Sequence, residues 1–191
     1  MKKQYLLVAA CITTLFSATA QAALSYSYVE GAYISSDLDI EGFSVDGDGV
    51  SLSGSAAVTP NIAINGYYET LSYDYGIDLD SLSIGVTFHT PLAAGTDFVA
   101  GIDYLDAEFS IDGFGSEDDT GNVLSAGVRH ELSNTAELEA NIVRVDIFEE
   151  TDTGFAIGLL MDITGTPTQV GFGFSDIGDE TSLKISARLN F

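Results

Sequence analysis

The chain has 191 residues, with 29 Asp and Glu against six Lys and Arg, and its formal net charge at pH 7 is −23. This length suits one domain, and the charge argues against nucleic acid as a partner, because polyanions repel one another. After the N-terminal region, no segment approaches the ~18 consecutive apolar residues of a transmembrane helix, so a helical inner-membrane protein is not expected.

The N-terminus has the pattern of a secretory signal peptide. Lys2 and Lys3 precede an apolar run over residues 6–16, and small residues follow up to Ala22. A charged region, an apolar region and a small-residue cleavage site in this order direct secretion. We therefore expect a signal peptide over residues 1–22 and one domain over residues 23–191. Cleavage removes two bases, which brings the net charge to −25.

A second reading of the N-terminus is lipidation at Cys11, which ends the lipoprotein-like sequence Val-Ala-Ala-Cys. Cleavage there would leave a very short apolar region before the cysteine, so removal of Cys11 with the signal peptide is favoured. The mature chain would then contain no cysteine and no disulfide in an oxidising compartment.

The mature chain alternates between apolar and polar residues in ten segments, which is the pattern of β-strands with two different faces. Segments rich in Gly, Asp, Asn or Pro separate them. The predicted strands are residues 24–35, 50–59, 62–73, 81–88, 97–109, 122–132, 137–147, 155–163, 170–175 and 181–191. In the seventh, the apolar positions change parity after Ile142, which predicts either a β-bulge or a strand that leaves the bilayer.

The connections alternate in character along the chain. Those after odd-numbered strands are acidic, and the longest are predicted loops over 37–49 and 106–121. Those after even-numbered strands are mostly neutral, and three contain a proline. With both termini in the periplasm, the acidic set is expected outside the cell.

The last segment, Thr181 to Phe191, has the cleanest alternation. Leu183, Ile185 and Leu189 share one face, and Lys184 and Arg188 share the other with serines and an asparagine. It resembles the closing strand of bacterial outer-membrane β-barrels, in which a terminal aromatic residue such as Phe191 is the signal read by the barrel-assembly machinery. The opening Leu-Ser-Tyr-Ser-Tyr-Val-Glu-Gly-Ala-Tyr at 24–33 and the segment 53–61 resemble small proteobacterial outer-membrane barrels with a tyrosine-rich first strand.

These observations predict an all-β fold: a closed, antiparallel, up-and-down transmembrane β-barrel of ten strands, with eight as the alternative. Every backbone polar group must be paired inside lipid, and closure achieves this. An even strand number returns the chain to its starting side. The resemblance implies the outer membrane as the location, with membrane lipid and lipopolysaccharide as surroundings. A soluble lipid-binding barrel with its apolar face inward is the rival, but the small polar residues of the other face suit a narrow lumen better.

Opposite charges are expected to pair inside the lumen. A three-residue turn at 133–135 places Arg129 opposite Glu139, and Lys184 and Arg188 are expected to meet Glu30 where the last strand closes on the first. Tyrosines near strand ends, namely Tyr26, Tyr28, Tyr68, Tyr73 and Tyr104, are candidates for the aromatic girdles.

The sequence does not predict a metal or cofactor site. Asp37, Asp39, Asp46 and Asp48 could offer oxygen ligands to a divalent cation, but they lack the spacing of an EF-hand. A solvated acidic loop is the favoured interpretation, and a weak divalent-ion bridge to lipopolysaccharide remains a hypothesis.

Catalysis is not expected. His89 and His130 fall beside predicted periplasmic turns, away from extracellular substrates, and no G-x-S-x-G motif is present. The favoured function is a non-enzymatic structural or surface-interaction role, in envelope integrity or adhesion. The alternative is a narrow pore that prefers cations, and an outer-membrane hydrolase or a soluble lipid-binding barrel comes third.

Overall fold

A computed structural model describes residues 18–19, 23–40 and 42–191. Ten strands form one closed barrel, and two short strands, β1 (Ala18–Thr19) and β2 (Ala23–Leu24), pair with each other. The predicted ten-strand barrel is confirmed, and the alternative of eight strands is wrong. Apart from 18–19, the predicted signal peptide lies outside the described residues, and so does Cys11. No helix that could cross a membrane occurs in the described part of the chain.

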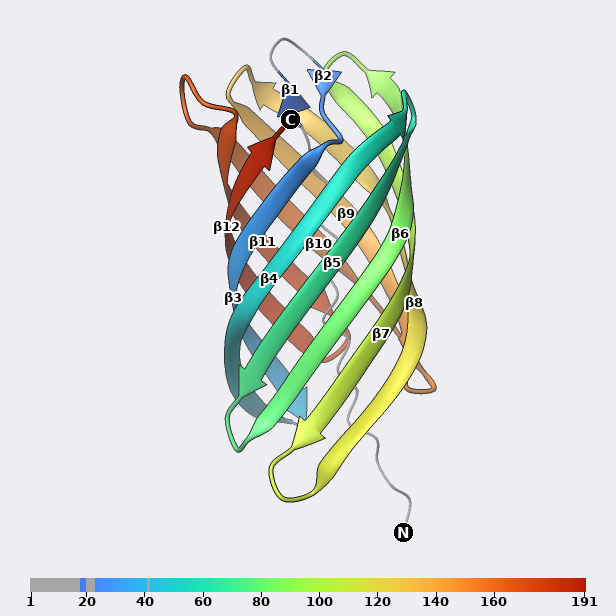
Figure 1. The fold of residues 1–191 in the computed structure, drawn as a ribbon, viewed down its shortest axis with the longest axis vertical. Coiled ribbons are helices and arrows are strands. Elements are labelled where there is room, and N and C mark those ends of the chain that lie inside the picture. The colour runs from blue at the N-terminus through green and yellow to red at the C-terminus, as the bar shows by residue number, and fades with distance from the viewer. Residues whose placement is uncertain (1–17, 20–22, 41) are drawn as a thin grey trace.

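The barrel is an up-and-down meander, in which each strand pairs antiparallel with the next along the chain and β12 pairs with β3 (Figure 1). Closure leaves no sheet edge, so the backbone polar groups of every strand find partners within the barrel. The strands are β3 (Tyr28–Ile40), β4 (Phe43–Thr59), β5 (Ile62–Tyr73), β6 (Ile77–Ala93), β7 (Thr96–Ile111), β8 (Gly115–Ser133), β9 (Ala136–Ile147), β10 (Glu150–Asp162), β11 (Thr168–Ile177) and β12 (Glu180–Asn190).

The two ends of the barrel differ. We call the end with Phe191 and the connections 60–61, 94–95, 134–135 and 163–167 the C-terminal end; it lies at the top of Figure 1. The opposite distal end carries Gly42 and the connections 74–76, 112–114, 148–149 and 178–179.

Apolar side chains cover the outside of the half nearer the C-terminal end. In β12, Leu183, Ile185 and Leu189 are 60%, 56% and 50% exposed and point away from the lumen. Leu82 and Ile84 in β6 and Ile102 in β7 continue this band. A water-soluble protein does not expose apolar surface all the way round, whereas a barrel in lipid requires it. The soluble barrel with an inward apolar face is therefore excluded.

The prediction of two long acidic loops is wrong, because most of their residues extend the strands. Residues 37–40 end β3, Gly42 is a turn residue and residues 43–49 begin β4, while 106–121 form β7 and β8 around a turn at 112–114. In the first of these, Asp39, Asp46 and Asp48 are exposed on the outside, while Leu38 and Val45 point inward and are buried. Density of Asp and Gly indicated turns, but the alternation with inward apolar residues continues through it.

The distal half thus reverses the pattern of the other half, with apolar side chains inside and charges outside. The inner cluster contains Ile34, Leu38, Val45, Leu71, Tyr73, Ile77, Leu79, Leu105, Ala107, Val123, Val143, Val145, Ile147, Ala156 and Ile177. In β9 the change falls between Ile142, which is 65% exposed, and Val143, which is 4% exposed. The pairing of β9 with β8 and β10 is regular there, so a bulge is wrong and the parity change marks this reversal.

Candidate functional site

The lumen of the half nearer the C-terminal end, which we call the membrane half because of its apolar outer band, is polar and is the first candidate site. Ser53 and Ser55 of β4, Asn65 of β5 and Thr87 of β6 are buried inside it. Asn65 connects two strands, because it donates to the Asp103 carboxylate of β7 and accepts from Thr87 Oγ1 at 3.0 Å. Polar side chains that hydrogen-bond across the lumen in this way compensate for the water they displace.

One ionic cluster lies at the seam where β12 meets β3. Arg188 and Glu30 are directly opposite in the ladder, and Arg188 Nη2 donates to Glu30 Oε2 at 2.5 Å. Lys184 Nζ donates to Glu30 Oε1 at 2.8 Å, so both carboxylate oxygens are engaged. The Arg188 guanidinium also lies over the Tyr28 ring, 4.0 Å from its centroid. The structure therefore brings the three predicted seam residues together and adds Tyr28 to them.

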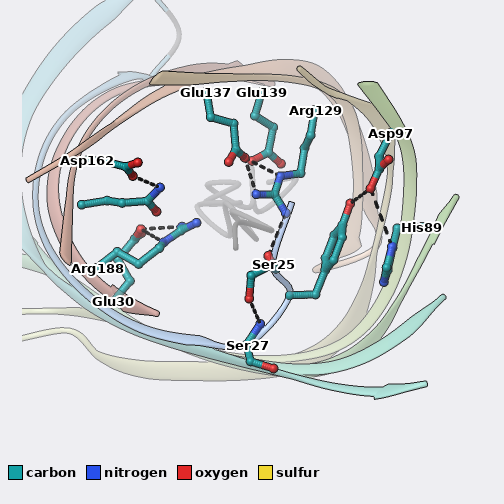
Figure 2. Close-up of polar contacts among 12 residues, drawn as sticks. Ser25, Ser27, Glu30, His89, Asp97, Arg129, Glu137, Glu139, Asp162 and Arg188 are labelled. Carbon is teal, nitrogen blue, oxygen red and sulfur yellow. Dashed lines mark hydrogen bonds and ion pairs between the residues drawn. The ribbon is translucent and has the colours of Figure 1, made fainter. Parts of the chain in front are cut away.

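A second cluster surrounds Arg129 on β8. Arg129 is directly opposite Glu139 of β9, as predicted, and it forms an ion pair with Glu137, two residues nearer the C-terminal end. A long side chain reaches its diagonal neighbour as easily as its direct one. Glu139 also accepts a hydrogen bond from Asn141 at 2.5 Å. In Figure 2, Arg129, Glu137 and Glu139 point into the lumen opposite Glu30 and Arg188.

The segment 24–27 closes over this cluster from inside the barrel, and its anchor is Tyr26. The Tyr26 ring stacks on His89 with centroids 3.4 Å apart, and Arg129 lies 4.7 Å from the same ring centroid. Its hydroxyl donates to Asp97 Oδ2 at 2.9 Å, as Figure 2 shows for the labelled Asp97. Arg129 Nη1 donates to the Ser25 carbonyl at 3.3 Å. These contacts fix the chain before β3 in the C-terminal mouth.

Three of the tyrosines expected in girdles are in the barrel interior. Tyr26, Tyr28 and Tyr73 are buried, while Tyr68 and Tyr104 face outward. Tyr26 and Tyr28 have the same parity as Glu30, so period two already placed them in the lumen once Glu30 was assigned there. Nearness to a strand end is a weaker guide than parity.

Both histidines lie near the C-terminal end. His89 was expected beside a turn after a strand that ends at 88, but β6 continues to Ala93 and buries His89 in the lumen. His130 Nδ1 and Thr96 Oγ1 are hydrogen-bonded at 2.8 Å across β8 and β7.

The four aspartates considered as metal ligands lie on the outside of the β3–β4 hairpin. Asp37 and Asp46 are opposite each other, Asp37 accepts from Ser44, and Asp39 accepts from the Gly42 amide at 2.6 Å. Among the described residues, no three His, Cys, Asp or Glu side chains are grouped as a metal site would require. The carboxylates therefore serve the hairpin turn and the acidic surface.

Comparison with known protein families identifies the chain. The model of the outer membrane protein β-barrel domain matches residues 7–175. The chain belongs to this family. The protein is therefore an outer-membrane β-barrel, in agreement with the apolar band on its outside.

Solved outer-membrane barrels are similar to this one at low sequence identity. The neisserial surface protein A (NspA) has 13% identity and a TM-score of 0.48, with 86% of this chain and 96% of that chain covered. The KdgM porin in complex with oligogalacturonate has 8% identity and a TM-score of 0.46, with 86% and 99% covered. Ail, the attachment invasion locus protein of Yersinia pestis, has 13% identity and a TM-score of 0.38, with 85% and 97% covered. Comparison with curated proteins found no match. Neither the scores nor the identities support a conclusion about function.

The distal end of this outer-membrane barrel has a feature that the alternation did not indicate. Phe43, Tyr75 and Phe114, from three successive hairpins, are 56%, 73% and 90% exposed. Tyr75 and Phe114 lie in connections and Phe43 is the first residue of β4, so period two gives little direction for these side chains. A count of aromatic residues in the connections would have found them.

Proposed function

We propose that this outer-membrane barrel is a non-enzymatic surface-interaction protein whose distal end projects from the cell. The apolar core inside the distal half supports this proposal most. Leu71, Leu79, Leu105 and Val123 are at most 1% exposed and pack in the apolar cluster of the distal interior. Beside this cluster, the buried Glu180 carboxylate accepts a hydrogen bond from Ser36 at 2.6 Å. An interior packed in this way makes a stiff support for a surface and opposes the passage of water and ions.

The outer surface of the same half supports the orientation. Asp39, Asp48, Asp80, Glu108 and Asp118 all point outward and are exposed. Carboxylates are costly in hydrocarbon, so this half stands outside the bilayer. Long strands that rise above the membrane would present this surface to whatever meets the cell.

Accessibility of single cysteines in intact cells tests the orientation. In a Cys11→Ser background, Ser116→Cys at the distal end should react with a membrane-impermeant maleimide. Asn134→Cys at the C-terminal end should react only after the outer membrane is opened. Both positions are exposed, so the two variants are matched. The reverse labelling pattern would overturn the proposal.

The competing proposal is a narrow pore that prefers cations. The polar lumen of the membrane half supports it, because Glu30, Glu69 and Glu139 line the interior. The aliphatic distal core opposes it. We therefore expect planar bilayers with the purified protein to show no conductance steps. Regular steps with cation selectivity would establish the pore instead.

Catalysis has little support from the histidines. His89 lies in the C-terminal mouth with one face covered by Tyr26, and His130 is hydrogen-bonded to Thr96. Neither position is near the distal surface, where an extracellular substrate would arrive.

We also propose lipid and the assembly machinery as partners. A shallow groove of about 680 Å³ on the outside, between Leu52, Gly54, Gly66 and Ile84, is open to acyl chains of the membrane. Phe191 is 67% exposed beside the outward face of β12, where a receptor could reach it. Phe191→Ser should lower the amount of heat-modifiable barrel in the outer membrane, and unchanged assembly would exclude this role.

A further inference from the structure

Three exposed aromatic side chains mark the distal end, and we call Phe43, Tyr75 and Phe114 the distal aromatic rim. Phe43 begins β4, Tyr75 lies in the connection between β5 and β6, and Phe114 lies in the connection between β7 and β8. The three hairpins are neighbours in the barrel, so the rings lie on adjoining stretches of its distal edge.

Contacts between the hairpins hold the rim together. The rings of Phe43 and Tyr75 are 6.0 Å apart between centroids. The Asp112 amide donates to the Gly76 carbonyl at 2.8 Å, which ties the hairpin of Phe114 to that of Tyr75. The Asp74 amide donates to the Asp46 carbonyl at 2.9 Å, which ties the hairpin of Tyr75 to that of Phe43. The rim is therefore one surface and not three separate loops.

Folding does not account for the aromatic residues of the rim. The three rings remain largely exposed to water, so they contribute little to the distal core. Tyr75 also has a φ of 67°, in the left-handed region that Gly and Asn adopt more easily. A bulky residue that is both exposed and strained points to a use of its ring in binding.

The charges around the rim select the partner. Asp39, Asp74 and Asp112 belong to the same three hairpin ends as the rings. Of the Lys and Arg residues that the structure describes, three lie in the lumen, and Arg144 on the outside is paired with Asp146 at 2.7 Å. Carboxylates and aromatic faces both attract ammonium and guanidinium groups. An anionic partner would be repelled here, and a neutral apolar one would leave the carboxylates without counter-charges.

We propose that the distal aromatic rim binds a basic polypeptide segment in which Arg or Lys alternates with apolar residues. The cations would meet the carboxylates and the faces of the rings, and the apolar residues would cover Phe43, Tyr75 and Phe114. This inference deepens the proposed surface-interaction function and rests on it for its biological setting. The binding itself can be measured on the isolated barrel, whichever way that barrel is oriented in cells.

The test uses the full-length barrel in lipid nanodiscs and a fluorescent peptide of alternating Arg and Leu. We expect saturable binding that weakens as salt rises. The variant Phe43→Ser/Tyr75→Asn/Phe114→Ser should bind at least about tenfold more weakly, as loss of buried aromatic anchors predicts. Tyr75→Asn should relieve backbone strain, and heat-modifiability on gels checks that the variant forms the native barrel.

Two controls make the result specific. Leu92→Ser removes a side chain that is 65% exposed at the opposite end of the barrel, and it should leave the affinity unchanged. A peptide with Glu in place of Arg should not bind. Equal affinity of the rim variant and the native barrel would overturn the proposal, and so would binding of the Glu peptide. If the native barrel formed dimers without peptide and the rim variant did not, that result would overturn the proposal and identify a second copy of the chain as the partner of the rim.

Discussion

Glu30 and Arg188 face each other across the seam that closes the barrel, with 2.5 Å between Oε2 and Nη2. Glu30 belongs to the first barrel strand and Arg188 to the last, so this ion pair joins residues far apart in the chain. Both side chains are at most 1% exposed, and Lys184 shares the same carboxylate. Closure of the sheet and neutralisation of these charges therefore depend on each other.

Replacing Glu30 should weaken the barrel strongly. Glu30→Gln leaves Lys184 and Arg188 in the lumen without the carboxylate that both contact, and removal of one partner from a buried pair costs about 3–5 kcal/mol. Urea unfolding in lipid vesicles measures the free energy of unfolding. Asp48→Asn, which removes a charge from the outer surface, is the control and should change it by less than about 0.5 kcal/mol. Similar unfolding midpoints for the two variants would contradict this account of the seam.

Arg129→Ala should lower stability more than removal of any outer carboxylate. Its guanidinium neutralises Glu137, contacts the Tyr26 ring and donates to the Ser25 carbonyl, so several interactions are lost together. The expected loss is of the order of 3–5 kcal/mol. Heat-modifiability on gels, with Asp48→Ala beside it, measures the difference. If both variants lost the folded gel band at the same temperature, the Arg129 cluster would contribute no more to stability than an outer carboxylate.

The distal core should behave like the interior of a soluble protein. Leu71→Ala removes a fully buried side chain, and a loss of about 2–5 kcal/mol is expected from the cavity that remains. Leu82→Ala changes the same residue type on the outside of the neighbouring strand, where lipid can fill the space, and should cost less. If Leu82→Ala proved the more harmful change, the distal interior would not be a packed core.

Tyr75→Asn should stabilise the barrel. The backbone at Tyr75 has a positive φ, and an unfavourable conformation of this kind costs about 1–3 kcal/mol, part of which Asn recovers. A gain of up to about 1 kcal/mol in urea unfolding is expected, in contrast to the effect of this substitution on peptide binding. A destabilised variant would mean that the Tyr75 ring contributes to folding through its contact with Phe43.

Alternation predicted the barrel well, because one rule of period two applies to every strand in it. The faces of β12, with Leu183 outside and Lys184 inside, follow from the sequence alone. Alternation says which residues share a face but not where the membrane stops. The distal half was therefore assigned to loops, although Leu38 and Val45 continue the pattern among the aspartates.

The sites were harder to predict than the fold. The residues of the seam could be paired from their order and parity, because β12 has to meet β3 in any closed barrel. The ladder indicated that Glu139 lies opposite Arg129, but the ion pair of Arg129 with Glu137 depends on the reach of a long side chain, which the ladder does not give. The Tyr26–His89 stack joins a segment before the first barrel strand to the fourth, a contact that no local pattern encodes.

Between Ile142 and Val143 of β9, the apolar side chains change from facing outward to facing inward, so the apolar band on the outside of the barrel ends at this step. The position of this step in each strand sets how much of the barrel matches the hydrocarbon core of the bilayer. Two extra residues inserted on the distal side of this step in every strand would lengthen each strand by about 7 Å, and the tilted barrel by about 5 Å, without changing the apolar band. The height at which the protein meets its surroundings is thus adjustable independently of its anchorage.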